Sequence, residues 1–195
     1  LYGPLTDSQT SLTGFVDKLS AIPLRFDPGT NWCYSLATDV CGALVEIISG
    51  QPFSEFLGER IFEPLDMSDT SFTISDEKVP RLAANYERDQ DKNLVLIDDP
   101  VESIYANTRR LQSGGGGLLS TTADYAKFCE MLLGGGKYNG CRIIGDRTLK
   151  MMCQNHLPMN ADLASVAMGS FSETAYEGVG FGLGFASTLS EVNAH

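Results

Sequence analysis

The fold of this chain is decided by the stretch Phe26-Asp27-Pro28-Gly29-Thr30-Asn31-Trp32-Cys33-Tyr34-Ser35-Leu36. Pro28-Gly29 predicts a turn, and the residues after Ser35 are typical of an apolar helix that ends at Gly50. Ser35 suits the N-cap, so Tyr34 is expected at the positive end of the helix dipole. That position stabilises a developing phenolate by up to about 1 kcal/mol.

Tyr34 is the first candidate for chemistry, as a proton-transfer residue. A tyrosine has an ordinary pKa of about 10, so acting as a base near neutral pH requires a cationic neighbour such as a buried lysine. The alternative is an aromatic ring packed under the turn with its hydroxyl hydrogen-bonded. The residues taken alone leave both interpretations open.

The rest of the chain is predicted to be mainly helical. Helices are expected over about 11–21, from Ser35 to Gly50, over about 52–62 and after Thr121, with short extended pieces near 83–86 and 94–97 and one strand near 181–189. Two apolar helix faces are predicted, formed by Val40, Leu44, Val45 and Ile48 in one helix and by Ala126, Cys129, Leu132 and Leu133 in another.

Three glycine-rich segments need separate interpretations. Ser113-Gly114-Gly115-Gly116-Gly117 precedes a helix that opens with the capping pattern Thr121-x-x-Asp124, and its backbone can approach a ligand closely. It is either a wall of a substrate pocket or a simple flexible loop. Gly134–Lys137 lacks the features of a phosphate loop and predicts a helix end, while Gly180–Phe185 predicts a closely packed strand.

Several ordered blocks together resemble a known family. They are Leu24–Thr30, Trp32–Ser35, Asp39–Gly50, Phe62–Phe72 and Ser113–Phe128. From about residue 11 to residue 186 the chain is similar to the serine β-lactamase-related family, especially the branch of class C β-lactamases and family VIII carboxylesterases. The resemblance implies an α+β, β-lactamase/transpeptidase-like fold, present here mainly as its helical part with little of the antiparallel sheet.

The resemblance also implies a mechanism and site residues. Relatives carry a Ser-x-x-Lys nucleophile, a Tyr-containing second element and a third element on a strand. Tyr34-Ser35-Leu36 matches the second, which makes Tyr34 the expected catalytic base, and Ser113, Gly114, Gly115 and Gly116 the expected substrate-binding wall. Leu36 stands where β-lactamases commonly carry Asn, which favours an esterase. No metal or organic cofactor is implied.

The nucleophile is not where the family would place it. The one Ser-x-x-Lys, Ser75-Asp76-Glu77-Lys78, follows the tyrosine element, is highly charged and precedes Pro80, so we predict a solvated loop there. Since residue 1 is Leu, we expect a single partial domain over 1–195 that lacks the nucleophile region and the closing sheet strands. Such a chain by itself is expected to be inactive.

The net charge and the hydropathy of the chain limit the classes of molecule that it is expected to bind. A net charge of −11 and a pI near 4.5 argue against nucleic acid and anionic membranes, and no apolar run is long enough to span a bilayer. A small-molecule ester or β-lactam is the expected partner, with self-association through an exposed apolar face as an additional expectation. His156 and His195 are isolated and are expected at the surface or at helix ends.

The number and spacing of the cysteines indicate whether the chain binds a metal and in which cellular compartment it is expected. The five cysteines are odd in number and have no C-x-x-C spacing, which argues against a metal site. They are expected to be free thiols, which favours a cytoplasmic location, although nothing else in the sequence identifies the compartment. Those in helical patterns are expected to be buried; they are Cys41, Cys129 and Cys153.

The sequence therefore favours a fragment of a serine hydrolase acting on carboxylic esters or β-lactams. Two alternatives stay open: a noncatalytic β-lactamase-like or peptidoglycan-binding module, and an interaction domain whose helical faces bind another chain.

Overall fold

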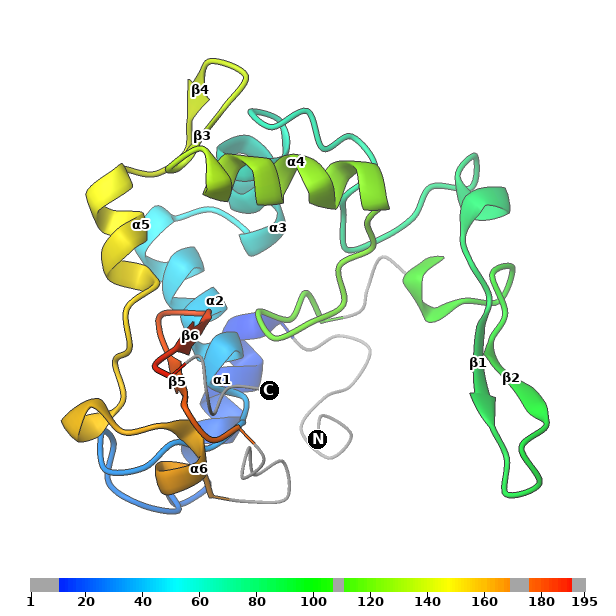
Figure 1. Ribbon diagram of the computed structural model, residues 1–195. Helices are drawn as coiled ribbons and strands as arrows, with labels where there is room; N and C mark the ends of the chain where they lie inside the picture. Colours follow the sequence, from blue (N-terminus) through cyan, green and yellow to red (C-terminus); the bar gives the residue numbers. More distant parts are fainter. Residues whose placement is uncertain (1–10, 107–110, 169–175, 191–195) are drawn as a thin grey trace. The chain divides into compact units, whose positions relative to one another are not determined.

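The structure is a computed structural model that describes residues 11–106, 111–168 and 176–190 (Figure 1). The chain divides into two compact units. The first contains the described residues of 1–19 and 39–125, and the second those of 20–38 and 126–195. Each unit is considered by itself, and the single partial domain over 1–195 stays a prediction.

The first helix, α1 (Leu12–Ser20), confirms the predicted helix over 11–21. The Ser11 hydroxyl accepts the Gly14 N–H at 3.1 Å and so satisfies one of the donors left open at a helix start. Leu12 and Phe15, one turn apart, are buried. They place α1 in the core of the first unit.

The second helix, α2 (Ala37–Ser49), is also confirmed, and Gly50 ends it with a φ of +70°. The predicted apolar face is not the buried one. The buried positions are Asp39, Gly42 and Ala43, whereas Leu44 and Ile48 are exposed, Ile48 to 82%. Because α2 is apolar on most sides, its periodicity cannot select the face. The exposed face of Leu44, Ile47 and Ile48 leaves self-association as a prediction.

The chain then forms α3 (Phe53–Leu57), which continues into the π-helical turn η1 (Gly58–Phe62), as expected over 52–62. The Phe53 N–H donates to the Glu46 carboxylate at 2.9 Å, and the Phe53 ring lies 5.8 Å from that of Phe72. These contacts join α2 to α3 and α3 to Phe72, which is buried, as are Leu65 and Met67.

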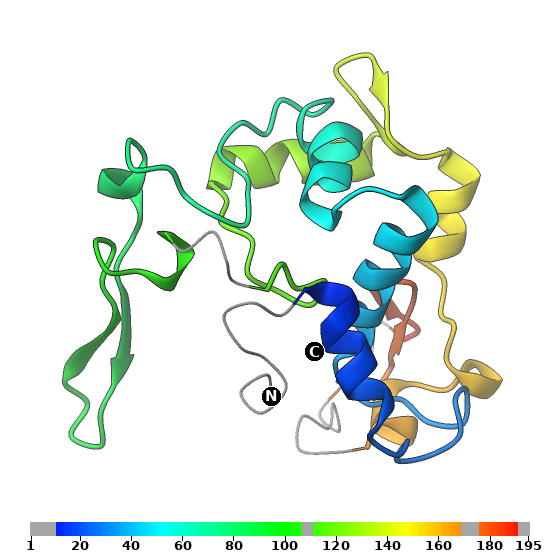
Figure 2. The same ribbon diagram turned by 180° about the vertical axis from the view of Figure 1, so that it is seen from behind.

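An antiparallel hairpin forms the extended pieces predicted near 83–86 and 94–97. Its strands are β1 (Asn85–Arg88) and β2 (Leu94–Asp98), drawn in green in Figure 2, flanked by the short 3-10 helices η2 (Val79–Arg81) and η3 (Ile104–Ala106). Both strands are exposed over nearly their whole length.

Helix α4 (Thr122–Leu133) begins where the capping pattern predicts, with the Asp124 N–H donating to the Thr121 hydroxyl at 3.1 Å. The predicted apolar stripe is wrong, because Leu133 is 89% exposed while Asp124 and Met131 are buried. Gly134–Lys137 does end the helix. The Gly136 N–H donates to the Met131 carbonyl at 2.9 Å, with φ of +84° at Gly136.

The remaining elements of the second unit are short. They are β3 (Lys137–Tyr138), β4 (Cys141–Arg142), α5 (Asp146–Met152), η4 (Pro158–Asn160), α6 (Leu163–Val166), β5 (Val179–Phe181) and β6 (Ala186–Thr188). The single strand expected near 181–189 is a hairpin of β5 and β6, because Gly184 with a φ of +90° reverses the chain. Close packing is confirmed, since a Cβ on Gly180 would collide with the Asn155 side chain.

Candidate functional site

The backbone that leads to Tyr34 is held in place within the second unit. Gly29, at a φ of +85°, completes the predicted turn. Trp32 donates its N–H to the Val166 carbonyl at 3.1 Å and accepts the Met168 N–H at 2.9 Å, a parallel bridge to the end of α6. The segment before Tyr34 is therefore held through both backbone polar groups of Trp32.

Aromatic contacts define the surroundings of Tyr34. Its ring centroid lies 6.4 Å from that of Trp32, which in turn makes an edge contact with Phe181 at 5.4 Å. The Ser35 hydroxyl accepts the Ala37 N–H at 3.3 Å and supports the start of α2, close to the expected N-cap. Tyr34 is 54% exposed, so a fixed backbone presents a side chain that solutes can reach.

The glycine run is attached to α2 within the first unit. The Ser113 hydroxyl donates to the Asp39 carboxylate at 2.5 Å, and the Gly115 N–H donates to the Ser113 hydroxyl at 3.0 Å. The Gly114 backbone packs closely against Gly42, since a Cβ on Gly42 would lie 3.3 Å from the Gly114 Cα. Ser113, Gly114 and Gly115 thus form an ordered segment at the first turns of α2, with Gly116 following. Its role as a substrate wall stays a prediction.

Sequence reasoning missed Asp39. Its side chain is completely buried, although it carries a carboxylate in a mainly apolar helix. The available signal is its spacing from Gly42 and Ala43, three and four residues later, where small side chains mark a face that can approach another segment closely. An acidic residue on such a face needs a buried hydrogen-bond donor.

Ser75-Asp76-Glu77-Lys78 has no arrangement suited to nucleophilic catalysis. Ser75 is exposed, and the Lys78 ammonium donates to the Ser68 carbonyl and to the Asp69 carboxylate, both at 2.8 Å. An activating lysine would instead be desolvated beside its serine. The structure agrees with the loop predicted for this segment.

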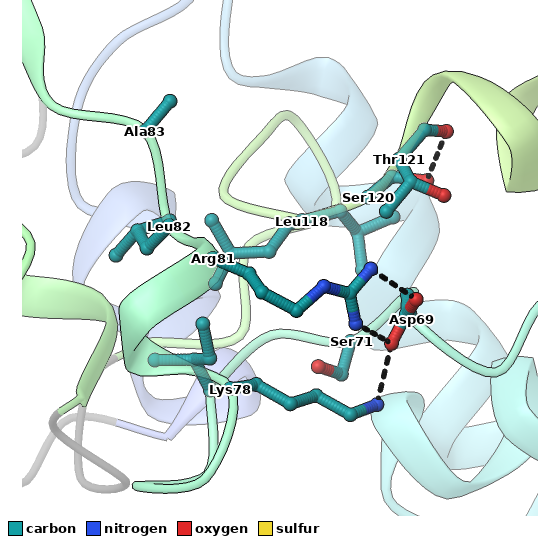
Figure 3. A pocket seen from close by; sticks show the side chains of 11 residues that line it. Asp69, Ser71, Lys78, Arg81, Leu82, Ala83, Leu118, Ser120 and Thr121 are labelled. Carbon is teal, nitrogen blue, oxygen red and sulfur yellow. Dashed lines mark hydrogen bonds and ion pairs between the residues drawn. The ribbon is translucent and has the colours of Figure 1, made fainter.

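Lys78 belongs to an ion cluster at a pocket of about 380 Å³ in the first unit (Figure 3). Arg81 binds both oxygens of Asp69, at 3.0 and 2.7 Å, and Figure 3 shows the Lys78 ammonium reaching the same carboxylate. Hydrogen bonds from Arg81 and then Lys78 hold the pKa of Asp69 far below its usual range, and Asp69 raises the pKa of Arg81. The cluster joins residue 69 to the turn at 78–81.

This cluster predicts a pH dependence of stability. Asp69 has a lower pKa folded than unfolded, so its contribution is present above the unfolded value of about 3.9 and disappears as the pH falls toward the folded value. We expect Asp69→Asn to lower the Tm slightly near pH 7, because the cluster is partly exposed, and the difference from wild type to shrink below about pH 4. Thermal unfolding of both proteins across this range measures it, and a constant difference would contradict the prediction.

Other polar candidates have structural partners. His156 is exposed and bonds the Met151 carbonyl at 2.8 Å at the end of α5, as expected, while His195 lies outside the described residues. All five cysteines are free thiols, but Cys41 and Cys153 are exposed rather than buried. In α2 the buried positions are Asp39, Gly42 and Ala43, and Cys153 lies just after the end of α5, while Cys129 is half-buried.

Two features are absent from the part of the chain that the structure describes. No three or more His, Cys, Asp or Glu side chains gather there in a way that could hold a metal ion. Nor is any helix within the described ranges long and apolar enough to cross a membrane.

Comparisons with known proteins give consistent matches. A family model described as Beta-lactamase matches residues 2–190. An uncharacterised protein of Mycobacterium tuberculosis is 32% identical over 165 residues, which are 85% of this chain and 40% of that protein. Lovastatin esterase of Penicillium rubens is 30% identical over 190 residues, 91% of this chain and 46% of the esterase.

A solved structure resembles the chain in three dimensions. EstCE1, described as a hydrolase with promiscuous acyltransferase activity, superposes with a TM-score of 0.74 at 28% identity, covering 97% of this chain and 50% of that one. The chain spans half or less of the length of these relatives.

Proposed function

Because this chain belongs to the beta-lactamase family and has its fold, we propose that it forms the tyrosine-bearing part of a serine hydrolase that cleaves carboxylic esters. The observation that carries the proposal is the presentation of Tyr34, anchored by the Trp32 backbone and exposed beside the start of α2. The single partial domain over 1–195 is part of the same proposal.

The proposed reaction has two acyl-transfer steps. A serine oxygen attacks the ester carbonyl carbon, and its proton passes to the Tyr34 phenolate oxygen, which is stabilised by a cationic lysine that, like the serine, is not assigned to a residue of this chain. The alcohol leaves with that proton. Water then attacks the acyl-serine, and the acid is released as the serine recovers its proton. Backbone N–H groups stabilise the oxyanion of each step. The serine is not assigned to a residue of this chain, since Lys78 of its one Ser-x-x-Lys is paired with Asp69.

Esters are favoured over β-lactams by two observations. Leu36 has no polar group with which to bind a lactam amide, and it occupies the position two residues after Tyr34. Lovastatin esterase, a relative named for an ester, matches 91% of this chain.

The test is an assay of the protein that carries this sequence, with p-nitrophenyl butyrate and with nitrocefin. We expect ester turnover with a burst of p-nitrophenol that equals the enzyme concentration, and a mass increase of one butyryl group on a serine. A folded protein that forms no acyl adduct and turns over no ester would overturn the proposal and favour a noncatalytic module.

Leu36→Asn tests the preference for esters. An amide at this position can hydrogen-bond a lactam carbonyl or N–H, and one such bond contributes about 1 kcal/mol. We expect the ratio of nitrocefin to p-nitrophenyl butyrate turnover, as kcat/KM, to rise by about fivefold. Leu36→Ala is the control, because it opens the same space without the amide, and an equal rise in both variants would contradict the explanation.

A further inference from the structure

We propose that Asp39 is a positioning residue that fixes the glycine loop, defined here as Ser113–Gly117, in the shape that selects the acyl group of the substrate. The proposal rests on the proposed function and on the prediction that this loop is a wall of the substrate pocket. It assigns a role to a buried carboxylate that the acyl-transfer chemistry does not use.

Burial of Asp39 requires a specific partner. The side chain is completely buried, and an ionised carboxylate removed from water is costly unless it accepts strong hydrogen bonds. The Ser113 hydroxyl supplies one at 2.5 Å, the length typical of a bond between a hydroxyl and a charged oxygen. Asp39 also lies in the first turn of α2, where the helix dipole favours a negative charge.

The bond to Asp39 sets the shape of the glycine loop beyond Ser113. Because the Ser113 hydroxyl donates its hydrogen bond to Asp39, its lone pairs point elsewhere, and one of them accepts the Gly115 N–H at 3.0 Å. These two consecutive hydrogen bonds fix the backbone from 113 to 115. A run of four glycines has no side chains that could do so, and it loses more conformational entropy on ordering than any other sequence.

A second contact places the glycine loop on the same helix. Gly42 lies one turn after Asp39, and a Cβ there would sit 3.3 Å from the Gly114 Cα and 2.9 Å from a methyl of Leu12. The loop backbone therefore rests directly on α2. The Asp39 carboxylate fixes the position of the loop along α2, and the absence of a side chain at Gly42 allows the loop backbone to approach the helix closely.

Another buried aspartate of the first unit, Asp124, has a different kind of partner. Asp124 accepts the Asp69 N–H at 2.8 Å and the Thr70 hydroxyl at 3.0 Å, and so stabilises the turn that leads to the ion cluster. It is a buried carboxylate of the same residue type, and these two bonds connect it to residues 69 and 70. Asp124 is therefore a matched control for burial and charge.

The experiment compares Asp39→Asn, Ser113→Ala and their double mutant in the protein that carries this sequence. The readout is the ratio of kcat/KM for p-nitrophenyl acetate and p-nitrophenyl octanoate. This ratio is independent of the folded fraction, because misfolded protein lowers both rates equally. We expect each single variant to change the ratio by about tenfold, since a displacement of about 1 Å in a substrate wall alters rates by up to 10².

Coupling between the two residues completes the test. The double mutant should change the ratio no more than either single variant, and Ser113→Thr, which keeps the hydroxyl, should preserve most of the wild-type ratio. Asp124→Asn should lower the Tm and leave the ratio unchanged.

The outcomes separate this inference from the proposed function. An unchanged ratio in Asp39→Asn, or effects of Asp39→Asn and Ser113→Ala that multiply independently, would overturn the positioning role even if ester hydrolysis is confirmed. Absence of ester turnover in the wild-type protein would instead overturn the proposed function, and the inference with it.

Discussion

Tyr34→Phe is expected to lower kcat for p-nitrophenyl butyrate by roughly 10²–10⁴, because the variant loses the only oxygen through which the proposed proton transfer runs. The ring and its contact with Trp32 remain, so the fold should be kept. KM should change far less than kcat, since the hydroxyl acts on the transition state more than on the bound ester.

The control for this prediction is Tyr86→Phe. Tyr86 lies on β1 and is 52% exposed, against 54% for Tyr34, so both changes remove a hydroxyl from a half-exposed tyrosine. Tyr86→Phe should leave kcat unchanged. Equal turnover in wild type and Tyr34→Phe would remove Tyr34 from the mechanism.

Phe15→Ala is expected to lower the free energy of unfolding by about 3–5 kcal/mol, the usual cost of emptying a fully buried aromatic position. Phe15 is completely buried in α1, and a typical domain has only about 5–15 kcal/mol of stability in total. Urea unfolding followed by circular dichroism gives the difference from the transition midpoint and slope.

Leu133→Ala is the matched control for Phe15→Ala. Leu133 also lies in a helix but is 89% exposed, so its loss should change stability by about 0.5 kcal/mol or less. A comparable loss in both variants would mean that the burial of Phe15 does not account for its contribution.

Much of the local structure could be predicted because it depends on residues close together in sequence. The hydroxyls of Ser11, Ser35 and Thr121 each accept a backbone N–H two or three residues later, at the start of the helix that follows. Gly50 and Gly136 end their helices with positive φ values. A capping hydrogen bond forms between residues close together in sequence and does not depend on the rest of the chain. Its sequence pattern therefore identifies a helix boundary without knowledge of the fold.

The buried helix faces could not be predicted in the same way. α2 carries apolar side chains on most sides, so Leu44 and Ile48 satisfy the helical period as well as Gly42 and Ala43 do. The strand expected near 181–189 failed for a related reason. Alternating glycine and apolar residues are compatible with one long strand or with two short strands joined by a turn. The chain reverses at Gly184, which adopts a positive φ, and glycine can adopt positive or negative φ equally well.

The sequence by itself determined the helices α1 to α4, the starts of three of them, the family and the position of Tyr34 before α2, because each rests on neighbouring residues or on ordered blocks of them. Tertiary structure alone decided that Asp39 holds Ser113, 74 residues away, and that Lys78 pairs with Asp69 rather than Ser75. A buried or paired charge takes whichever partner the folded backbone brings within about 3 Å, and that distance depends on the whole path of the chain between them.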